Sequence, residues 1–252
     1  MNTAPVISRL RTGKGSAVAG LVISAGAALI MVLFISSDRQ TAPMPVMAER
    51  PIQHDGSALY VQKFEVTVGE WNTCYEDGDC TLKLRPPPGK AAETTPATGL
   101  NHEDVDKYIT WINNRTTHNF RLPTIAEWKA MASSVLPDAP DPTFTDPSLT
   151  WASAYMTEGN APRALKSQGS FSQTSDGIAD LDGSVWEWTR DCYAGTTKGD
   201  AAANCPAYWA GGEHIAAIPY LVRDPARGGC AVGTPPAHLG LRLVTDTRLN
   251  DH

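Results

Sequence analysis

The spacing of apolar and polar residues predicts several helices in the first half of the chain. A run of β-forming residues over 59–66 predicts a strand. Thr67 comes directly after it, with Glu70 three positions on, which is the capping-box arrangement that begins a helix. Apolar residues at helical spacing over 101–115, with acidic residues in the first turn, predict a second helix, and another capping box at Thr124 begins a third.

The pattern changes in the second half of the chain to short strands separated by turns. A proline-rich loop over 137–147 marks the change. Runs of β-forming residues then predict strands at 185–189, 226–232 and 239–245. Helices followed by short strands in long loops predict an α+β domain.

An uncharged apolar segment lies close to the N-terminus. Residues 17–35 are 19 residues without a charge or a proline, and a helix of that length spans about 28 Å, close to the thickness of a bilayer core. Arg9, Arg11 and Lys14 precede it, so the positive-inside rule keeps the N-terminus in the cytoplasm and places the rest across the membrane. A cleaved signal peptide is the alternative, although its apolar stretch is normally shorter.

These features divide the chain into four predicted parts. Gln40 to Pro51 contains three prolines and few bulky residues, which is typical of a linker. The parts are a cytoplasmic N-terminus (1–16), a transmembrane signal anchor (17–36), a linker (37–55) and one folded domain (56–252). We expect a single-pass protein of the bacterial inner membrane with its domain in the periplasm, or a periplasmic protein if the segment is cleaved.

Composition and charge narrow the class of protein. With 42% apolar residues, the chain of 252 residues has the composition of a globular protein. Its formal net charge is −6, and no run of Lys or Arg is interleaved with aromatic residues. Because phosphate binding needs a basic face, a nucleic acid is not an expected partner.

Five short motifs occur along the chain. Each motif alone is a weak indication of a family, but the five in this order are a specific one. They are Phe64-Glu65-Val66-Thr67 with Trp71, Arg121-Leu122-Pro123-Thr124 with Glu127-Trp128, Gly183-Ser184-Val185-Trp186-Glu187-Trp188, Arg227-Gly228-Gly229, and Leu239-Gly240-Leu241-Arg242-Leu243-Val244. In this order they resemble the motifs of the formylglycine-generating enzyme family, also called the sulfatase-modifying factor family. The resemblance covers about residues 59 to 245.

The resemblance implies a C-type-lectin-like fold with little regular secondary structure and many buried aromatic residues. We expect Arg121 and Glu127 to form a structural ion pair, and strand alternation puts Trp186 and Trp188 on one face with Glu187 on the other. The motif residues to which we assign a structural role are Arg121, Glu127, Trp128, Trp186, Trp188, Arg227, Gly228, Gly229 and Arg242.

Four of the five cysteines form two local pairs in the sequence. A helix continued from Cys74 to Cys80 would separate the two residues by about 9 Å along its axis, so the helix must end before a disulfide can form. Cys192 and Cys205 flank a loop of 12 residues. The residues alone leave free thiols or a zinc site open, although the spacing is poor for zinc. The family resemblance and an oxidising compartment favour two disulfides.

Cys230 is the cysteine that remains, and it stands where the family has a serine. The resemblance implies that active members bind copper(I) through two later cysteines in a C-x-x-x-x-C pattern and activate oxygen against a substrate cysteine. Residues 231–239 contain no cysteine, so we do not expect copper or the parent oxidase reaction. A reactive Cys230 beside His238 and a buried, unreactive Cys230 are both left open.

The resemblance also implies a structural calcium site. In the family, the loop that includes Asp180 and Glu187 holds calcium through carboxylate, carboxamide and backbone carbonyl oxygens, which are the hard ligands that calcium prefers. Both acids are kept here, and Ser184 replaces the usual asparagine. The alternative is that the acids are solvated in a turn.

Three functions follow from these patterns. The one we favour is a membrane-anchored accessory, maturation or binding factor for an unidentified envelope or periplasmic enzyme. Cys230 directly after Arg227-Gly228-Gly229 favours the type associated with nitrite reductase and denitrification. The alternatives are a protein-modifying oxidoreductase that uses Cys230 and a lectin-like structural binding module.

Overall fold

The fold is mixed α+β with short elements. The computed structural model describes residues 44–136, 164–193, 205–225 and 238–249, all within the compact unit Thr41–His252. Its elements, in chain order, are β1 (Ile52–His54), β2 (Ser57–Val61), α2 (Val68–Glu76), α3 (His102–Arg115), α4 (Ile125–Ala132), β3 (Trp186–Tyr193), β4 (Ala207–Gly211), β5 (Ala216–Pro219), β6 (Leu239–Gly240) and β7 (Val244–Thr245).

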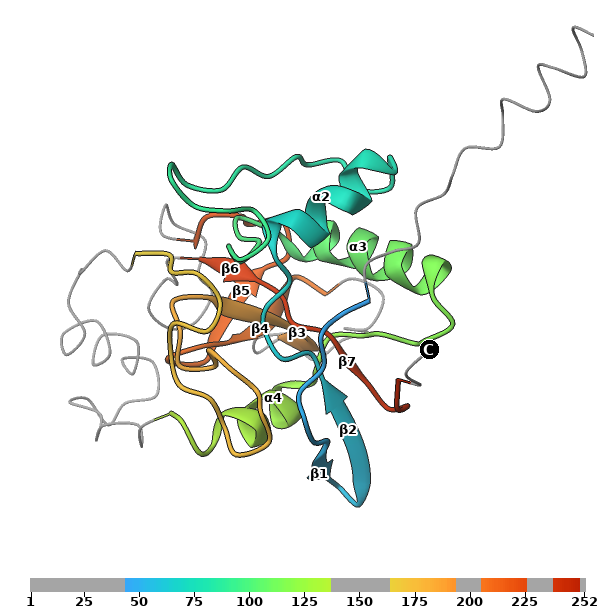
Figure 1. Cartoon of the computed structure of the whole chain (residues 1–252), viewed down its shortest axis with the longest axis vertical. Helices are drawn as coiled ribbons and strands as arrows, with labels where there is room; N and C mark the ends of the chain where they lie inside the picture. Colours follow the sequence, from blue (N-terminus) through green and yellow to red (C-terminus); the bar gives the residue numbers. More distant parts are fainter. Residues whose placement is uncertain (1–43, 137–163, 194–204, 226–237, 250–252) are drawn as a thin grey trace, which may run out of the picture. The chain divides into compact units, whose positions relative to one another are not determined.

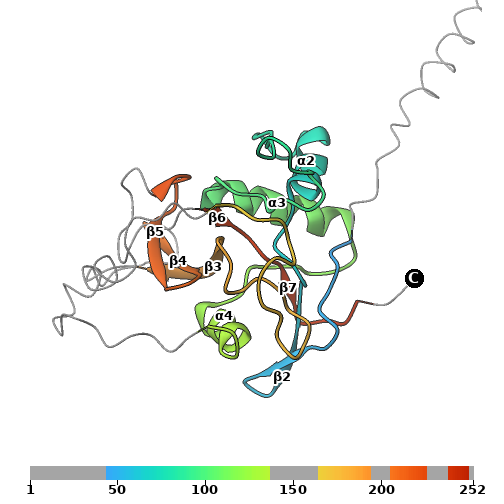
Figure 2. The ribbon, with the colours of Figure 1, turned by 60° about the vertical axis from the view of Figure 1, so that its left-hand side comes forward.

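A four-stranded sheet is the centre of the domain. Its strand order is β5-β4-β3-β6, with β3 antiparallel to β4 and parallel to β6. Figures 1 and 2 show α2 and α3 on one side of this sheet and α4 on the other. The helices therefore cover the sheet from both sides, and the first half of strand β3, with its two tryptophans, is buried.

The second sheet joins the two ends of the domain. Strands β1 and β2 form a hairpin, and β2 pairs antiparallel with β7 near the C-terminus. Residues that we assigned to the linker 37–55 take part in this arrangement: β1 belongs to the hairpin, and the N–H of Ala48 donates to the carbonyl of Val61 at 2.8 Å. The folded part therefore includes residues 44–55, because backbone pairing with β2 holds a segment whose proline content predicted a linker.

Each of the three helices in the described part of the chain begins with a complete capping box. The side chains of Thr67, Asn101 and Thr124 each accept from the backbone N–H three residues on, and the acidic side chain at that position bonds back to the cap. These bonds satisfy N–H groups that have no partner within a helix. The predicted helices are confirmed, with starts at or next to the expected residues.

The strand predictions differ from the structure in their bounds. Strand β2 ends at Val61 and β3 continues to Tyr193, while the predicted strand 226–232 lies outside the described residues. The predicted strand 239–245 is divided into β6 and β7. Between them the chain passes from one sheet to the other, and the carbonyls of Leu241 and Leu243 accept from residues on the β2 side.

Tryptophan side chains link segments that regular secondary structure does not connect. Five tryptophans are at most 1% exposed, and each indole N–H donates to a residue at least 11 positions away. The donor and acceptor residues are Trp71 and Leu82, Trp111 and Asp77, Trp128 and Glu187, Trp186 and His214, and Trp188 and Leu100. Buried indoles normally find such partners, and here the partners fix the long loops to the core.

Two disulfides close local loops. Cys74 pairs with Cys80, and Cys192 pairs with Cys205. The helix ends at Glu76, as the first disulfide requires, and Gly78 has a φ of 85° in the turn that brings Cys80 back. Glycine adopts such a φ without steric cost. Both predicted disulfides are confirmed.

The predicted membrane segment 17–36 lies outside the described residues. Within the described ranges, no helix is long and apolar enough to cross a membrane.

Candidate functional site

A buried arginine organises the centre of the domain. The Arg242 side chain has no exposed surface. Its Nη1 donates to the carbonyls of Gln62 and Lys63 at 3.0 and 2.6 Å, and its Nη2 donates to the carbonyl of Ala179 at 2.9 Å. One side chain thus joins the segment after β2, the loop before β3 and its own segment between the two sheets.

Glu187 is the counter-ion of Arg242. Its Oε1 accepts from Nη2 of Arg242 at 2.7 Å, and both of its oxygens accept from Nε at 3.0 and 3.1 Å. Strand alternation points Glu187 away from the face of Trp186 and Trp188, as predicted, and toward Trp128, whose indole N–H donates to Oε2 at 2.9 Å. Burial disfavours the charged guanidinium, but Glu187 and Glu65 outweigh it and raise the pKa of Arg242.

Glu65 is a second carboxylate beside the same arginine. It is 2% exposed, and its Oε2 lies 3.8 Å from Nη2 of Arg242. Among the described residues, that oxygen has no hydrogen-bond partner. Burial raises the pKa of Glu65 to about 8 even though Arg242 acts in the opposite direction, and the negative charge of Glu187 adds to the increase. Two buried carboxyl groups therefore lie beside one guanidinium. Of the two, Glu187 is the one that accepts the hydrogen bonds of Arg242.

The predictions assigned no role to Glu65. The available signal was its position between the apolar residues Phe64 and Val66 in the Glu-Val-Thr motif. A charged residue inside an otherwise apolar run that ends at a helix cap is unusual unless it has a buried partner.

A second ion pair forms near the start of α4. Nη1 and Nη2 of Arg121 each donate to one oxygen of Glu127 at 2.8 Å, and Nη2 also donates to Asp246 at 2.6 Å. Burial alone would raise the pKa of Glu127, but hydrogen bonds from Arg121 and from the backbone N–H of Thr124 lower it to about 2. The predicted Arg121–Glu127 ion pair is confirmed, and its bidentate geometry fixes the first turn of α4.

Asp180 closes a loop through backbone hydrogen bonds. Its Oδ1 accepts from the N–H of Phe171 at 2.8 Å, its Oδ2 accepts from the N–H of Gly169, and its φ is 66°. Glu187, the other predicted calcium ligand, is engaged by Arg242 and Trp128. As arranged, the two acids do not form a ligand set, and the described part of the chain contains no cluster of three acidic, His or Cys side chains that fits a metal ion. Calcium binding stays a prediction, and the ion would have to compete with these donors.

The candidate reactive cysteine and the structural motif that precedes it lie outside the described residues. This applies to Cys230 and to Arg227, Gly228 and Gly229 of the same motif. A copper(I) site of the family type needs two free cysteines. Of the five cysteines in this chain, four are joined in disulfides. One remaining thiol does not fit a copper(I) site built from two thiolates.

The geometry defines an α+β domain of short elements, tied together by a buried Arg–Glu pair, tryptophan hydrogen bonds and disulfides. A sequence profile described as "sulfatase-modifying factor enzyme 1-like domain" matches residues 14–247. The chain therefore belongs to the sulfatase-modifying factor family, which includes the formylglycine-generating enzymes.

A search of solved structures also gave matches over most of the chain. PvdO from Pseudomonas aeruginosa is 15% identical, with 80% of this chain and 90% of that chain covered and a TM-score of 0.48. Variable protein 1 of Treponema denticola is 16% identical, with coverages of 81% and 94% and a TM-score of 0.48. CarF is 15% identical, with coverages of 82% and 100% and the same TM-score of 0.48. A comparison with curated proteins gave no significant match.

We predict that Glu187→Gln lowers the free energy of unfolding by about 3 kcal/mol, because it leaves the buried Arg242 without its hydrogen-bonded counter-ion. Urea unfolding measures the change. The matched control is Glu49→Gln, which breaks the surface pair with Lys63 at 3.2 Å and is expected to cost less than about 1 kcal/mol. Equal losses in the two variants would contradict the central role of the buried pair.

The low pKa of Glu127 predicts a pH dependence of stability. The folded-state pKa of about 2 lies below the ordinary value of 4.5, so the ion pair stabilises the fold above about pH 4.5 and loses this effect as the pH falls toward about 2. The difference in free energy of unfolding between the natural chain and Glu127→Gln should therefore be constant near neutral pH and shrink over that interval. Urea unfolding at a series of pH values measures it, with Glu76→Gln on exposed surface as the control. A difference that does not change with pH would rule the ion pair out as its source.

Proposed function

We propose that this protein is an accessory factor of the cell envelope. In this proposal, residues 17–36 anchor it in the inner membrane, and its domain on the periplasmic side binds or helps to mature a periplasmic enzyme. The domain does not carry out the copper-dependent oxidation that the family resemblance implies for active members.

The arrangement of cysteines is the observation that carries the proposal. Cys74–Cys80 and Cys192–Cys205 occupy four thiols in positions that close local loops. The only remaining cysteine, Cys230, is followed by nine residues without another cysteine before Gly240. A reaction that needs a pair of copper-binding thiolates has no ligands left in this chain.

Two further features support a location outside the cytoplasm. Disulfides form and persist in oxidising compartments such as the periplasm. The apolar residues 17–35 follow three basic residues and no acidic ones, which is the charge pattern of a segment that leaves its N-terminus in the cytoplasm. The disulfides and the charge pattern are independent of each other, and both favour export of the domain.

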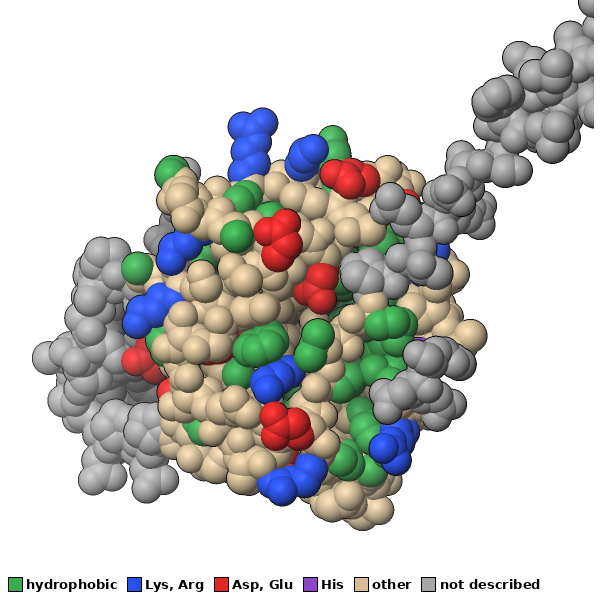
Figure 3. All heavy atoms as spheres, in the orientation of Figure 1, with side chains coloured by type: hydrophobic (Ala, Val, Ile, Leu, Met, Phe, Trp, Pro, Cys, Tyr) green, Lys and Arg blue, Asp and Glu red, His purple; other side chains and the backbone are tan. Residues whose placement is uncertain are grey.

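The surface charge favours a protein partner over a nucleic acid. The chain has a formal net charge of −6. On the face drawn in Figure 3, Lys and Arg side chains are scattered among uncharged and acidic ones and do not gather into a basic patch. Cys230 in the motif that begins at Arg227 extends the proposal to an enzyme of the copper nitrite reductase type as the client.

The first test asks whether the parent reaction is absent. The purified full chain, in detergent with copper(I) and oxygen, should convert no C-x-P-x-R peptide to the aldehyde, because it lacks the thiolate pair. Aldehyde formation is measured by mass spectrometry after labelling with a hydroxylamine probe, and an active copper-containing member of the family is the positive control. Conversion that is lost in Cys230→Ser would overturn the proposal and assign the chemistry to that thiol.

The second test addresses the accessory role in cells. A host strain that lacks this chain should show reduced activity of its periplasmic copper nitrite reductase, with the amount of reductase protein measured in parallel. The full chain and Cys230→Ser should both restore activity, because the proposed role is binding and not thiol chemistry. Unchanged activity in the strain without the chain would contradict the assignment of nitrite reductase as the client.

A further inference from the structure

A pocket opens from the surface toward Glu65. Its volume is about 390 Å³, and its wall is made by the segment between β2 and α2, the first turns of α2 and two loops that follow in the sequence. The polar side chains that line it include Gln62, Glu65, Thr67, Glu70, Glu93 and Gln168.

Burial distinguishes the base of this pocket from its mouth. Gln62, Glu65 and Thr67 are at most 4% exposed, so they form its base. Glu93 is exposed and lies at the mouth, together with Val46, which is 61% exposed. A ligand entering between these outer residues would approach the carboxyl group of Glu65.

The ionisable side chains that line the pocket are all acidic. Three glutamates line the pocket, and no Lys, Arg or His is among the described residues that line it. Glu70 uses Oε2 to accept from the backbone N–H and the hydroxyl of Thr67 at the start of α2. Oε2 of Glu65 has no hydrogen-bond partner within the described ranges, because Arg242 gives its hydrogen bonds to Glu187 and to backbone carbonyls. The unpartnered oxygen is buried, and such a group is costly unless something binds it.

The chemistry of the wall favours an organic cation over a metal ion. The pocket is much larger than an ion, and no cluster of metal-binding side chains occurs among the described residues. Phe64 and Val46 also line it, and they offer apolar contact for a methylene chain. Lysine and arginine side chains combine such a stem with a charged head.

We propose that this pocket binds the ammonium or guanidinium group of a lysine or arginine side chain from a partner polypeptide, with Glu65 as the buried counter-charge. The site does not depend on the proposed accessory role or on its client, so either proposal can fail without the other.

The electrostatics of Glu65 sets a condition on this assignment, because its carboxyl group must lose a proton to act as the counter-charge. Burial raises the pKa of Glu65 to about 8 and also raises the pKa of Glu70. The charged groups that act on Glu65 are Arg242, which favours its ionised form, and Glu187 and Asp180, which oppose it. A second cation beside Glu65 would favour the ionised carboxylate, as an opposite charge at short range does generally.

The test uses N-acetyl-lysine amide and N-acetyl-arginine amide as probes, with N-acetyl-norleucine amide as the neutral control of similar length. Binding to the full chain in detergent is measured by calorimetry or by NMR shifts. We expect both cations to bind at least ~10-fold more tightly than the norleucine compound, and Glu65→Gln to weaken cation binding by at least ~10-fold.

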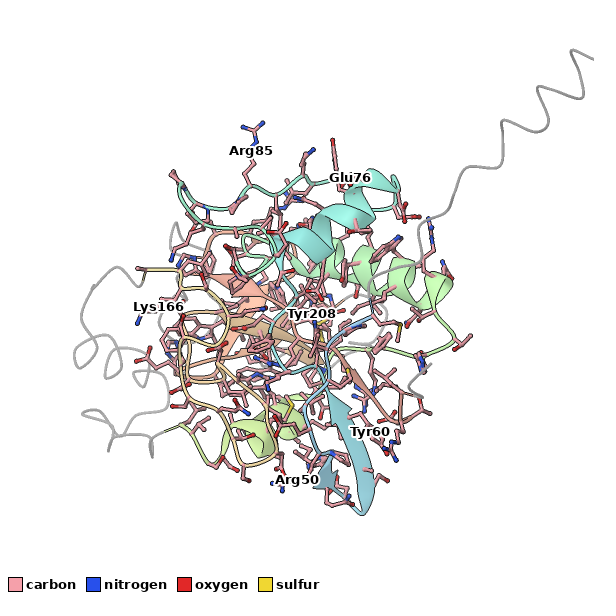
Figure 4. The ribbon with its side chains drawn as sticks, viewed as in Figure 1. Arg50, Tyr60, Glu76, Arg85, Lys166 and Tyr208 are labelled. Carbon is pink, nitrogen blue, oxygen red and sulfur yellow. A yellow bond between two sulfur atoms is a disulfide. The ribbon has the colours of Figure 1, made fainter. Side chains whose placement is uncertain are left out.

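Two variants on one helix supply the matched comparison. Glu70→Gln removes a pocket charge but keeps a residue that completes the capping box, and it should weaken cation binding by about 3-fold. Glu76→Gln removes a charge at the last turn of α2, outside the pocket, and should leave binding unchanged (Figure 4). If Glu65→Gln does not fold, the comparison of Glu70→Gln with Glu76→Gln decides the result.

Several outcomes would overturn the proposal. Norleucine amide that binds as tightly as the cations would show an apolar site without charge recognition. Full cation binding by Glu65→Gln would remove that residue as the counter-charge. Equal weakening by Glu70→Gln and Glu76→Gln would assign the effect to the overall negative charge of the chain.

Discussion

The buried guanidinium of Arg242 is the interaction on which the rest of the domain depends. It bonds to Glu187 in β3 and to the backbone of residues 62, 63 and 179. These segments are far apart in the sequence, and much of the chain between them is loop. A guanidinium without exposed surface must have its donors satisfied, so folding requires all of these segments to reach their places together. The ion pair therefore acts mainly by fixing where these segments lie relative to one another. Buried pairs of this kind add little net stability over an apolar core.

The same arrangement explains why Glu65 differs from Glu187. Strand β3 holds Glu187 against Arg242, and Trp128 adds a further donor. Glu65 lies on the segment before α2, at 3.8 Å from the guanidinium, and no described residue donates a hydrogen bond to its Oε2. A well-packed domain normally avoids an unsatisfied buried carboxyl group. Its position beside an open pocket gives a physical reason for keeping it, because a bound donor would satisfy it.

Local patterns predicted the local parts of this structure. Thr67, Asn101 and Thr124 begin helices through contacts within three residues, and the alternation of Trp186, Glu187 and Trp188 needs only the strand they belong to. The Arg121–Glu127 pair is likewise a contact between residues six positions apart. Each of these follows from short-range physics that a sequence displays directly.

The parts that could not be predicted depend on partners far away in the sequence. Residues 44–55 have the composition of a linker and become part of the fold because β2 pairs with them, and β2 in turn pairs with β7 near the C-terminus. The pKa and the contacts of Glu65 depend on Arg242, which is 177 positions later. The family motifs include Glu65, Glu187 and Arg242, but they do not indicate which of the two acids accepts the hydrogen bonds of the arginine. That is settled by the strand that carries Glu187, since a rigid strand can hold a carboxylate in bidentate geometry and a loop before a helix cap holds it less closely.

The cysteines show how a family scaffold can be separated from its chemistry. Both disulfides close loops of the scaffold: one holds the chain that returns from the end of α2, and the other joins the ends of a loop between β3 and β4. Neither disulfide involves Cys230, which precedes the segment where the resemblance places the two copper-binding cysteines. The scaffold is specified by buried tryptophans, the Arg242–Glu187 pair and the capping boxes, none of which requires a thiolate pair. The fold therefore does not require the two cysteines that active members use, and what the domain does must be argued from the sites on it.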